Sequence, residues 1–208
     1  MATPPAPLAP DRPAHLLLPV LPLPDVCLFP ESSLAVVVAR PPALKALEIA
    51  GRSGRRVLAL AQKDPTTPSP GRELHRVGTL AEVTEDRPLS DGTHRVELDG
   101  LRRARVVDFH GAETLLAEAE PLDEGDAGDE WGPAVEALAR YIHSHADLRS
   151  FLDEQRRSAE PMAWVNLACQ HLPITATARQ KLLESDAAAR CLRISRGLDA
   201  LLRKEHGS

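Results

Sequence analysis

Aromatic residues are scarce and make up only 3% of the 208 residues. A surface that binds single-stranded nucleic acid by stacking bases on aromatic rings is therefore not expected. Positive charge is also lacking, because 25 lysines and arginines face 30 acidic residues, giving a net charge of -5. A generic nucleic-acid-binding protein needs a strong basic field to release counterions. The composition therefore disfavours nucleic acid as the partner.

Cysteine and long hydrophobic runs are equally scarce. The three cysteines, Cys27, Cys169 and Cys191, are too few and too widely spaced for a disulfide framework. Their apolar neighbours predict free, buried and unreactive thiols. Apolar stretches such as 34–39 are far too short to span a bilayer, and no secretory signal is visible. These features predict a soluble, cytoplasmic protein that does not enter a membrane.

Motifs for catalysis and for metal binding are missing. The sequence has no G-x-x-x-x-G-K-[ST], G-x-S-x-G, H-E-x-x-H or C-x-x-C pattern. His143 and His145 are two residues apart on a predicted helix, so they point apart and cannot share a metal. The acidic run 123–130 lacks the order of residues found in a calcium loop. We therefore expect no cofactor, no metal and no catalytic residue.

What is present divides into two compositional halves. Residues 1–15 carry five prolines, which predict a disordered, extended tail. Residues 16–122 read as a β domain whose first strand, rich in proline, is expected at a sheet edge. Pro41-Pro42 opens a helix over 43–50, and Asp91-Gly92 marks a hairpin. The remaining strands are predicted at 34–38 (buried), 57–61, 77–83, 94–98, 103–109 and 114–120.

Residues 123–130 read as a solvated acidic linker, and residues 131–208 as a helical subdomain. Thr175 is predicted to cap one helix, and Ser185-Asp186 the last one. In that last helix, apolar residues at 187, 191, 194, 198 and 201 form a seam over about two heptads. We expect the seam to pack within the chain, which favours a monomer, with a dimer as the alternative. The other helices are predicted from 131, around 148–152 and over 162–172.

Seven short motifs occur in a specific order along the chain. In turn they are LPVLPLPDVCLFP (18–30), the strand and helix of 34–50, VLALAQKD (57–64), LHRVGTLA (74–81), DG with GLRRARV (91–106), RQKLLE (179–184) and ARCL (189–192). Each is weak alone, but together they resemble the amino-terminal substrate-binding domain of Lon-type ATP-dependent proteases. The resemblance covers about 16–205 and implies an α+β fold. That fold is a mostly antiparallel, PUA-like β pseudo-barrel followed by a helical bundle.

The departures from the family pattern are informative. Pro24 replaces a charged or polar residue, and Glu31-Ser32 replaces the glycine that normally follows the FP dipeptide. We therefore expect Glu31 in a turn that does not need a positive φ. The chain ends at Ser208 without the ATPase and Ser-Lys peptidase modules of the family. The resemblance thus implies a stand-alone, non-catalytic binding module.

Three functions follow as hypotheses. The leading one is a protein-binding adaptor in protein quality control, whose partners are unfolded or degron-bearing clients and a protease. Its binding surface is expected at the edge of the strand 18–29 or in the cleft between the two halves. The second is a PUA-like RNA-binding protein, whose candidate binding surface is Arg102, Arg103 and Arg105, with Arg52, Arg55 and Arg56 as a separate patch. The third is a hydrolase with an unrecognised site.

Overall fold

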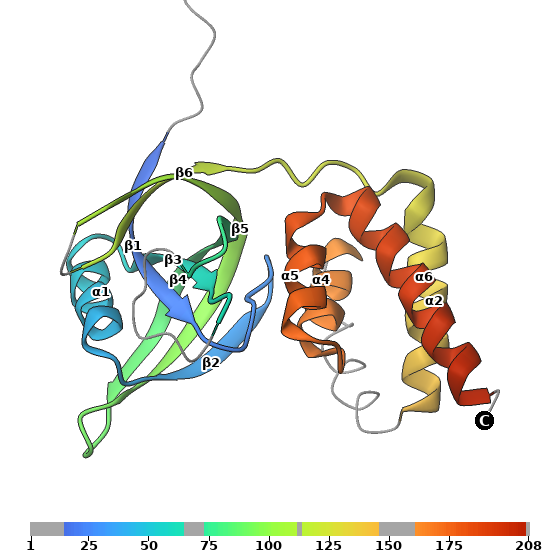
Figure 1. Cartoon of the computed structure of the whole chain (residues 1–208), viewed down its shortest axis with the longest axis horizontal. Coiled ribbons are helices and arrows are strands. Elements are labelled where there is room, and N and C mark those ends of the chain that lie inside the picture. Colours follow the sequence, from blue (N-terminus) through green and yellow to red (C-terminus); the bar gives the residue numbers. More distant parts are fainter. Residues whose placement is uncertain (1–14, 65–72, 112–113, 146–160, 207–208) are drawn as a thin grey trace, which may run out of the picture.

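The computed structural model describes residues 15–64, 73–111, 114–145 and 161–206. The predicted tail up to residue 14 and the predicted helix around 148–152 lie outside these ranges. The described residues form a β half and a helical half, side by side (Figure 1). The strands are β1 (Leu16–Leu23), β2 (Ser33–Val38), β3 (Arg56–Ala61), β4 (Val77–Pro88), β5 (His94–His110) and β6 (Leu116–Pro121). The helices are α1 (Pro41–Arg52), α2 (Trp131–Ser144), α4 (Pro161–His171), α5 (Ala176–Glu184) and α6 (Ala187–His206), with the short 3₁₀ helix η1 (Gly128–Glu130) before α2.

The strands form one sheet in the order β2-β5-β4-β3-β1-β6, and β6 pairs with β5 as well as with β1. Five strands therefore close into a barrel, and β2 is attached to β5 outside that ring (Figure 1). Strands β1 and β3 are parallel, and the other recorded pairs are antiparallel. The predicted α+β class, with its mostly antiparallel pseudo-barrel and helical bundle, is confirmed.

β5 is one strand of 17 residues, although the sequence predicts two separate strands at 94–98 and 103–109. Its first half pairs with β2, its second half pairs with β6, and β4 lies along its other side. The pairing of β5 with β4 shifts register between Gly100 and Arg102, and a Cβ atom on Gly100 would lie 2.1 Å from the carbonyl oxygen of Phe29. Glycine at this position thus allows the loop after β1 to cross the strand without interrupting it.

The prediction that the first strand is an edge strand holds only in part, because its two halves have different partner strands. Leu16–Pro19 pair with β6, and Val20–Leu23 pair with β3. β1 therefore lies between β6 and β3 in the order of the sheet, but each half is paired on one side, and the other side of its second half has no described strand. Apolar residues on both of its faces are buried: Leu21 and Leu23 belong to the cluster beneath α1, and Leu18 and Val20 to a second cluster inside the β half.

β2 corrects a second prediction. The sequence predicts a buried strand at 34–38, but its residues alternate between inner and outer positions. Val38 is buried, whereas Val37 is 66% exposed. Among the described residues, β2 pairs with β5 on one side and with no strand on the other. The run is thus an edge strand, and its valines reflect β propensity more than burial.

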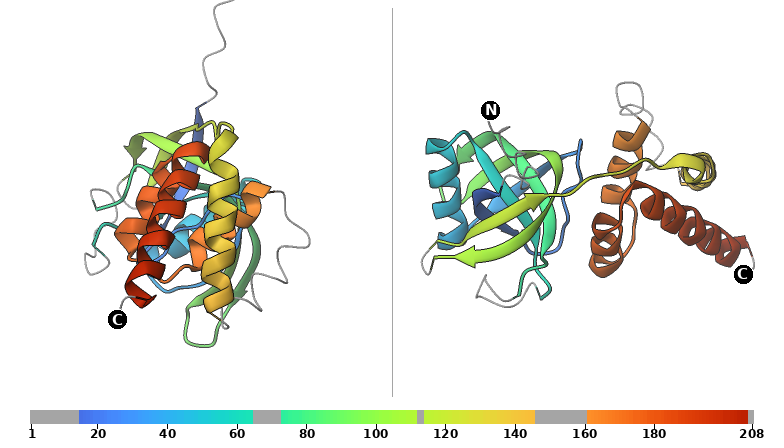
Figure 2. Two further views of the ribbon diagram at one scale, coloured as in Figure 1. Left: turned by 90° about the vertical axis from the view of Figure 1, so that its right-hand side faces the viewer. Right: turned by 90° about the horizontal axis from the view of Figure 1, so that it is seen from above.

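The helical half follows the predicted caps. Thr175 Oγ1 accepts a hydrogen bond from Ala178 N at the start of α5, and Asp186 Oδ1 accepts one from Ala189 N at the start of α6. The seam of α6 is buried from Ala187 to Leu198 and packs against apolar residues of α2, α4 and α5. Intramolecular packing of the seam is therefore confirmed. α2 and α6 lie on the side away from the barrel, while α4 and α5 face it (Figure 2).

Candidate functional site

A groove of about 260 Å³ opens on the β half, where the second half of β1 and the strand β2 lie apart. Its walls are Pro22 and Pro24 on one side and Val36 and Val38 on the other. The start of α1 and Gln62, just after β3, complete it. The groove exists because β6 pairs only with the first half of β1, and no described strand continues beside the second half.

The β1 wall is unsuited to pairing with another strand. Val20 donates its N–H to the carbonyl of Leu115 on the β6 side, whereas the carbonyl of Leu23 accepts from Gln62 on the β3 side. Because backbone groups alternate in direction along a strand, the backbone of Pro22 points the same way as that of Val20 and faces the groove. Proline has no N–H, so this wall lacks a donor where one would be needed.

The β2 wall, in contrast, is an open edge. The carbonyl of Ser32 accepts from Gly100 on β5, so Leu34, Val36 and Val38 direct their backbone groups toward β5. The backbone groups of Ser33, Ala35 and Val37 consequently point outward. Gln170 of α4 donates to the carbonyl of Ser33 at 2.8 Å, which covers the beginning of the edge. Ala35 and Val37 are thus positioned to exchange backbone hydrogen bonds with an added strand.

Gln62 supplies a polar group to the groove. Its side chain is 5% exposed, and its Oε1 accepts from Arg40 Nη1 at 3.4 Å, which fixes the orientation of the amide. The remaining donor, Nε2, is buried and has no hydrogen-bond partner in the described structure. A buried donor without an acceptor costs about 1–3 kcal/mol. This unpaired donor belongs to one of the residues that line the groove.

The arginines proposed from the sequence do not form one surface. Arg103 is 2% exposed, and its guanidinium group donates to Glu124 Oε1 at 2.6 Å and to the carbonyls of Asp123 and Leu183 at 2.7 and 3.3 Å. It therefore joins the β half to the helical half. Arg102 and Arg105 are exposed, and a binding role for them stays a prediction.

The separate patch of Arg52, Arg55 and Arg56 is also divided. Arg52 pairs with Glu48 at 2.7 Å, and Arg55 donates to the carbonyls of Val83 and Thr84, while Arg56 is exposed. The structure thus uses Arg55 to hold a turn. It does not gather the three guanidinium groups at one ligand position.

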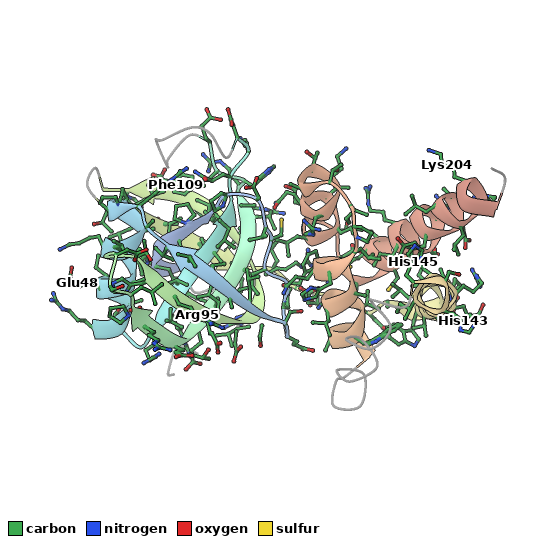
Figure 3. The ribbon with its side chains drawn as sticks, turned by 90° about the horizontal axis from the view of Figure 1, so that it is seen from below. Glu48, Arg95, Phe109, His143, His145 and Lys204 are labelled. Atoms are coloured by element: carbon green, nitrogen blue, oxygen red, sulfur yellow. The ribbon has the colours of Figure 1, made fainter. Side chains whose placement is uncertain are left out.

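Metal ligands are not gathered either. His143 and His145 lie at the end of α2, away from the barrel (Figure 3). Among the described residues, no group of three His, Cys, Asp or Glu side chains is placed to hold a metal ion. Within the same ranges, no helix is long and apolar enough to cross a membrane.

The sequence did not identify the groove. In the sequence, Gln62 appears only as part of the motif VLALAQKD, directly after an apolar strand. The prolines of β1 did indicate an unpaired strand edge. The open edge nevertheless belongs to β2, because pairing between distant strands decides which edge is free.

Comparison with known proteins places this geometry in a wider group. Residues 17–199 match the family of ATP-dependent protease La (LON) substrate-binding domains. The Lon protease of Xanthomonas oryzae pv. oryzae is 34% identical over 191 residues, which are 86% of this chain and 22% of that protein. Lon protease 1 of Thermus thermophilus is 33% identical over 201 residues, 91% of this chain and 25% of that protein. The chain thus spans about a quarter or less of the length of these relatives.

Two solved structures share the fold. The N-terminal domain of the Mycobacterium avium complex Lon protease superimposes with a TM-score of 0.72 at 17% identity, covering 89% of this chain and 98% of that one. A Lon N-terminal domain protein from Xanthomonas campestris gives 0.59 at 21% identity, covering 85% and 95%. These similarities concern the arrangement of the strands and helices.

Proposed function

The chain belongs to the family of ATP-dependent protease La (LON) substrate-binding domains, and from this premise we propose that it binds polypeptide clients without cleaving them. The clients are unfolded or degron-bearing proteins, which the module presents to a protease as an adaptor in quality control. The single observation that carries this proposal is the open edge of β2 beside an apolar groove.

Strand addition is the binding mode that this geometry supports best. An extended client segment would pair with the outward backbone groups of Ala35 and Val37. Backbone pairing is independent of sequence, which suits a protein that must accept many clients. The exposed side chain of Val37 would contact the apolar residues of the client.

The groove adds a preference to this mode. Its volume of about 260 Å³ lies below the roughly 300–1,000 Å³ of most small-molecule sites, so it suits side chains of an extended segment. Pro22, Pro24 and Val36 supply apolar contacts, and Gln62 Nε2 supplies one hydrogen bond to a client carbonyl. Unfolded segments carry both features, an apolar side chain and an unpaired carbonyl.

The experiment measures binding of fluorescein-labelled, reduced and carboxymethylated α-lactalbumin, which stays unfolded, by fluorescence anisotropy. Val37→Pro removes the outward N–H at a strand edge, where proline is tolerated. It should weaken binding about tenfold, the equivalent of about 1.4 kcal/mol. Val37→Thr keeps the N–H and should bind within about twofold of the wild type, since a twofold change is under about 0.5 kcal/mol.

Failure of the wild-type chain to bind, or equal binding by Val37→Pro, would overturn the proposal. A single-stranded RNA probe, tested in parallel, discriminates the RNA-binding alternative. Incubation with fluorescent casein, with and without ATP, tests the non-catalytic part, because cleavage by the purified chain would make it an enzyme.

A further inference from the structure

A second groove, of about 550 Å³, lies on the helical half between α5 and α6. Its floor is formed by the buried side chains of Leu172, Leu182, Ile194 and Leu198. Ile174 and Leu201, both partly buried, extend the apolar surface toward its ends. The groove belongs to the opposite half of the molecule from the β2 edge.

Three cations flank this apolar floor. Lys181 of α5 and Arg193 and Arg196 of α6 line the groove, and all three side chains are exposed. Among the described residues, none of the three has an acidic group within ion-pair distance. The nearby acids are engaged elsewhere, since Asp199 pairs with Arg140 at 2.8 Å and Glu184 bonds to Gln180 at 2.9 Å. A chain of net charge -5 therefore concentrates unpaired positive charge at one apolar groove.

Gly197 is an independent observation at the same place. It lies inside α6 and lines the groove, and a Cβ atom added there would meet no atom within 4 Å. Glycine in a helix interior costs about 1 kcal/mol relative to alanine. No part of the described chain packs so closely against Gly197 that a side chain at this position would clash. The absence of a side chain at Gly197 would allow the backbone of another molecule to approach α6 closely.

We propose that the α5–α6 groove binds an amphipathic helix of a partner protein, with acidic residues along the margins of its apolar face. The apolar face covers Leu182, Ile194 and Leu198, and the helix axis passes closest at Gly197. Carboxylates on the two margins pair with Lys181 on one side and with Arg193 and Arg196 on the other. The partner is thus recognised as a folded helix, whereas the client at β2 is bound as an extended segment.

The test uses a fluorescein-labelled peptide of about 18 residues, which spans about 27 Å as a helix. It carries leucines at helical spacing on one face and glutamates along both margins. A matched peptide has lysine in place of every glutamate. We expect the glutamate peptide to bind the wild-type chain at least about tenfold more tightly than the lysine peptide, as charge complementarity would require.

Charge reversal in the protein should reverse this order. The double variant Arg193→Glu/Arg196→Glu should bind the lysine peptide more tightly than the glutamate peptide. Arg102→Glu/Arg105→Glu makes the same change in net charge on the barrel and should keep the wild-type preference. Equal binding of the two peptides to the wild type, or an unchanged preference in the first variant, would overturn the proposal.

Gly197→Leu tests the groove without removing any packing. Leucine favours the helix, so the melting temperature should be equal to or above that of the wild type, while affinity for the glutamate peptide should fall at least about tenfold. Unchanged affinity would contradict the proposal. A wild-type dimer in analytical ultracentrifugation whose interface covers the groove would contradict it as well. Because Val37→Pro should bind the glutamate peptide normally, failure at this groove and failure at β2 are separate results.

Discussion

The carboxylate of Glu124 lies 3.0 Å from Nη2 of Arg190, so the segment that connects the two halves pairs with the last helix. Its other oxygen lies 2.6 Å from Nε of Arg103 on β5. Arg190 is fully buried and Arg103 nearly so. Arg190 also lies over the ring of Phe29, with 5.7 Å between Cζ and the ring centroid. One acidic residue of the predicted solvated linker therefore neutralises two buried cations, one from each half.

Glu124→Ala should destabilise the protein by about 3 kcal/mol, because removing one partner of a buried ion pair leaves uncompensated charge. Urea unfolding measures the change. Glu136→Ala is the control, because that side chain is 77% exposed and lies 3.9 Å from Arg140. The control should change the free energy of unfolding by less than about 0.5 kcal/mol. Equal losses in the two variants would show that Glu124 is an ordinary surface residue.

Glu31 corrects an expectation, because it adopts a φ of +58°, whereas the sequence predicts a turn that does not need a positive φ. Residues with a Cβ atom pay about 1–2 kcal/mol in this conformation. Glu31→Gly should therefore be more stable than Glu31→Ala by about 1 kcal/mol. Both variants remove the same carboxylate, so thermal unfolding of the pair isolates the backbone effect. Identical melting temperatures would contradict this explanation.

His75 should make stability depend on pH. Burial lowers the pKa of His75, and this outweighs the opposing effect of Glu184, which lies 3.5 Å away. The unfolded state thus binds the proton more readily, so stability is present above the usual histidine pKa of about 6.5 and is lost as the pH falls below it. His75→Gln should reduce this loss in urea unfolding at several pH values. The same substitution at the exposed His143 is the control, and an equal reduction there would refute the assignment to His75.

The cysteines should react slowly in the native protein. All three are free and buried, as the sequence predicted. Burial raises the pKa of Cys27 to about 11 and that of Cys169 to about 12, and it raises the pKa of Cys191 as well. Thiolates are the reactive form, so a thiol reagent at pH 8 should label the unfolded chain quickly and the native chain hardly at all. Rapid native labelling of all three would contradict the buried positions.

Leu198→Ala tests the packing of α6. The side chain is 2% exposed, so its truncation should cost about 2–5 kcal/mol and lower the melting temperature by about 4–20 °C. Val37→Ala, at an exposed site, should have little effect. For a monomer, neither melting temperature depends on protein concentration. A wild-type melting temperature that rises with concentration, and a variant that loses this dependence, would make the seam a dimer interface.

Short sequence motifs were sufficient to predict those helix ends and turns that depend on residues close to them in the sequence. Thr175 and Asp186 cap their helices as predicted, and Asp91-Gly92 forms its turn with Gly92 at a φ of +83°. The apolar spacing of α6 also identified its buried side. In each case, neighbours within a few residues determine the conformation.

Long-range pairing was not accessible in the same way. The apolar runs of β1 and β2 look alike, yet β1 lies between two strands and β2 at an edge. Glu124 looks like a solvated acid until Arg103 and Arg190 are brought to it from 21 and 66 residues away. Gln62 became a candidate site residue only when β1 and β2 left a groove beside it. These features depend on tertiary contacts that no short segment encodes.

The unbroken strand β5 fixes a distance across the molecule. Val96, which pairs with Val36 of β2, and Arg103, which is held by the helical half, are seven residues apart on it. At about 3.3 Å per residue, they are at most about 23 Å apart, because the register of the strand shifts between Gly100 and Arg102. A segment added to β2 would therefore be held at a fixed distance from the helices. Tension on that segment would be transmitted along the backbone of β5 to the Arg103 anchor.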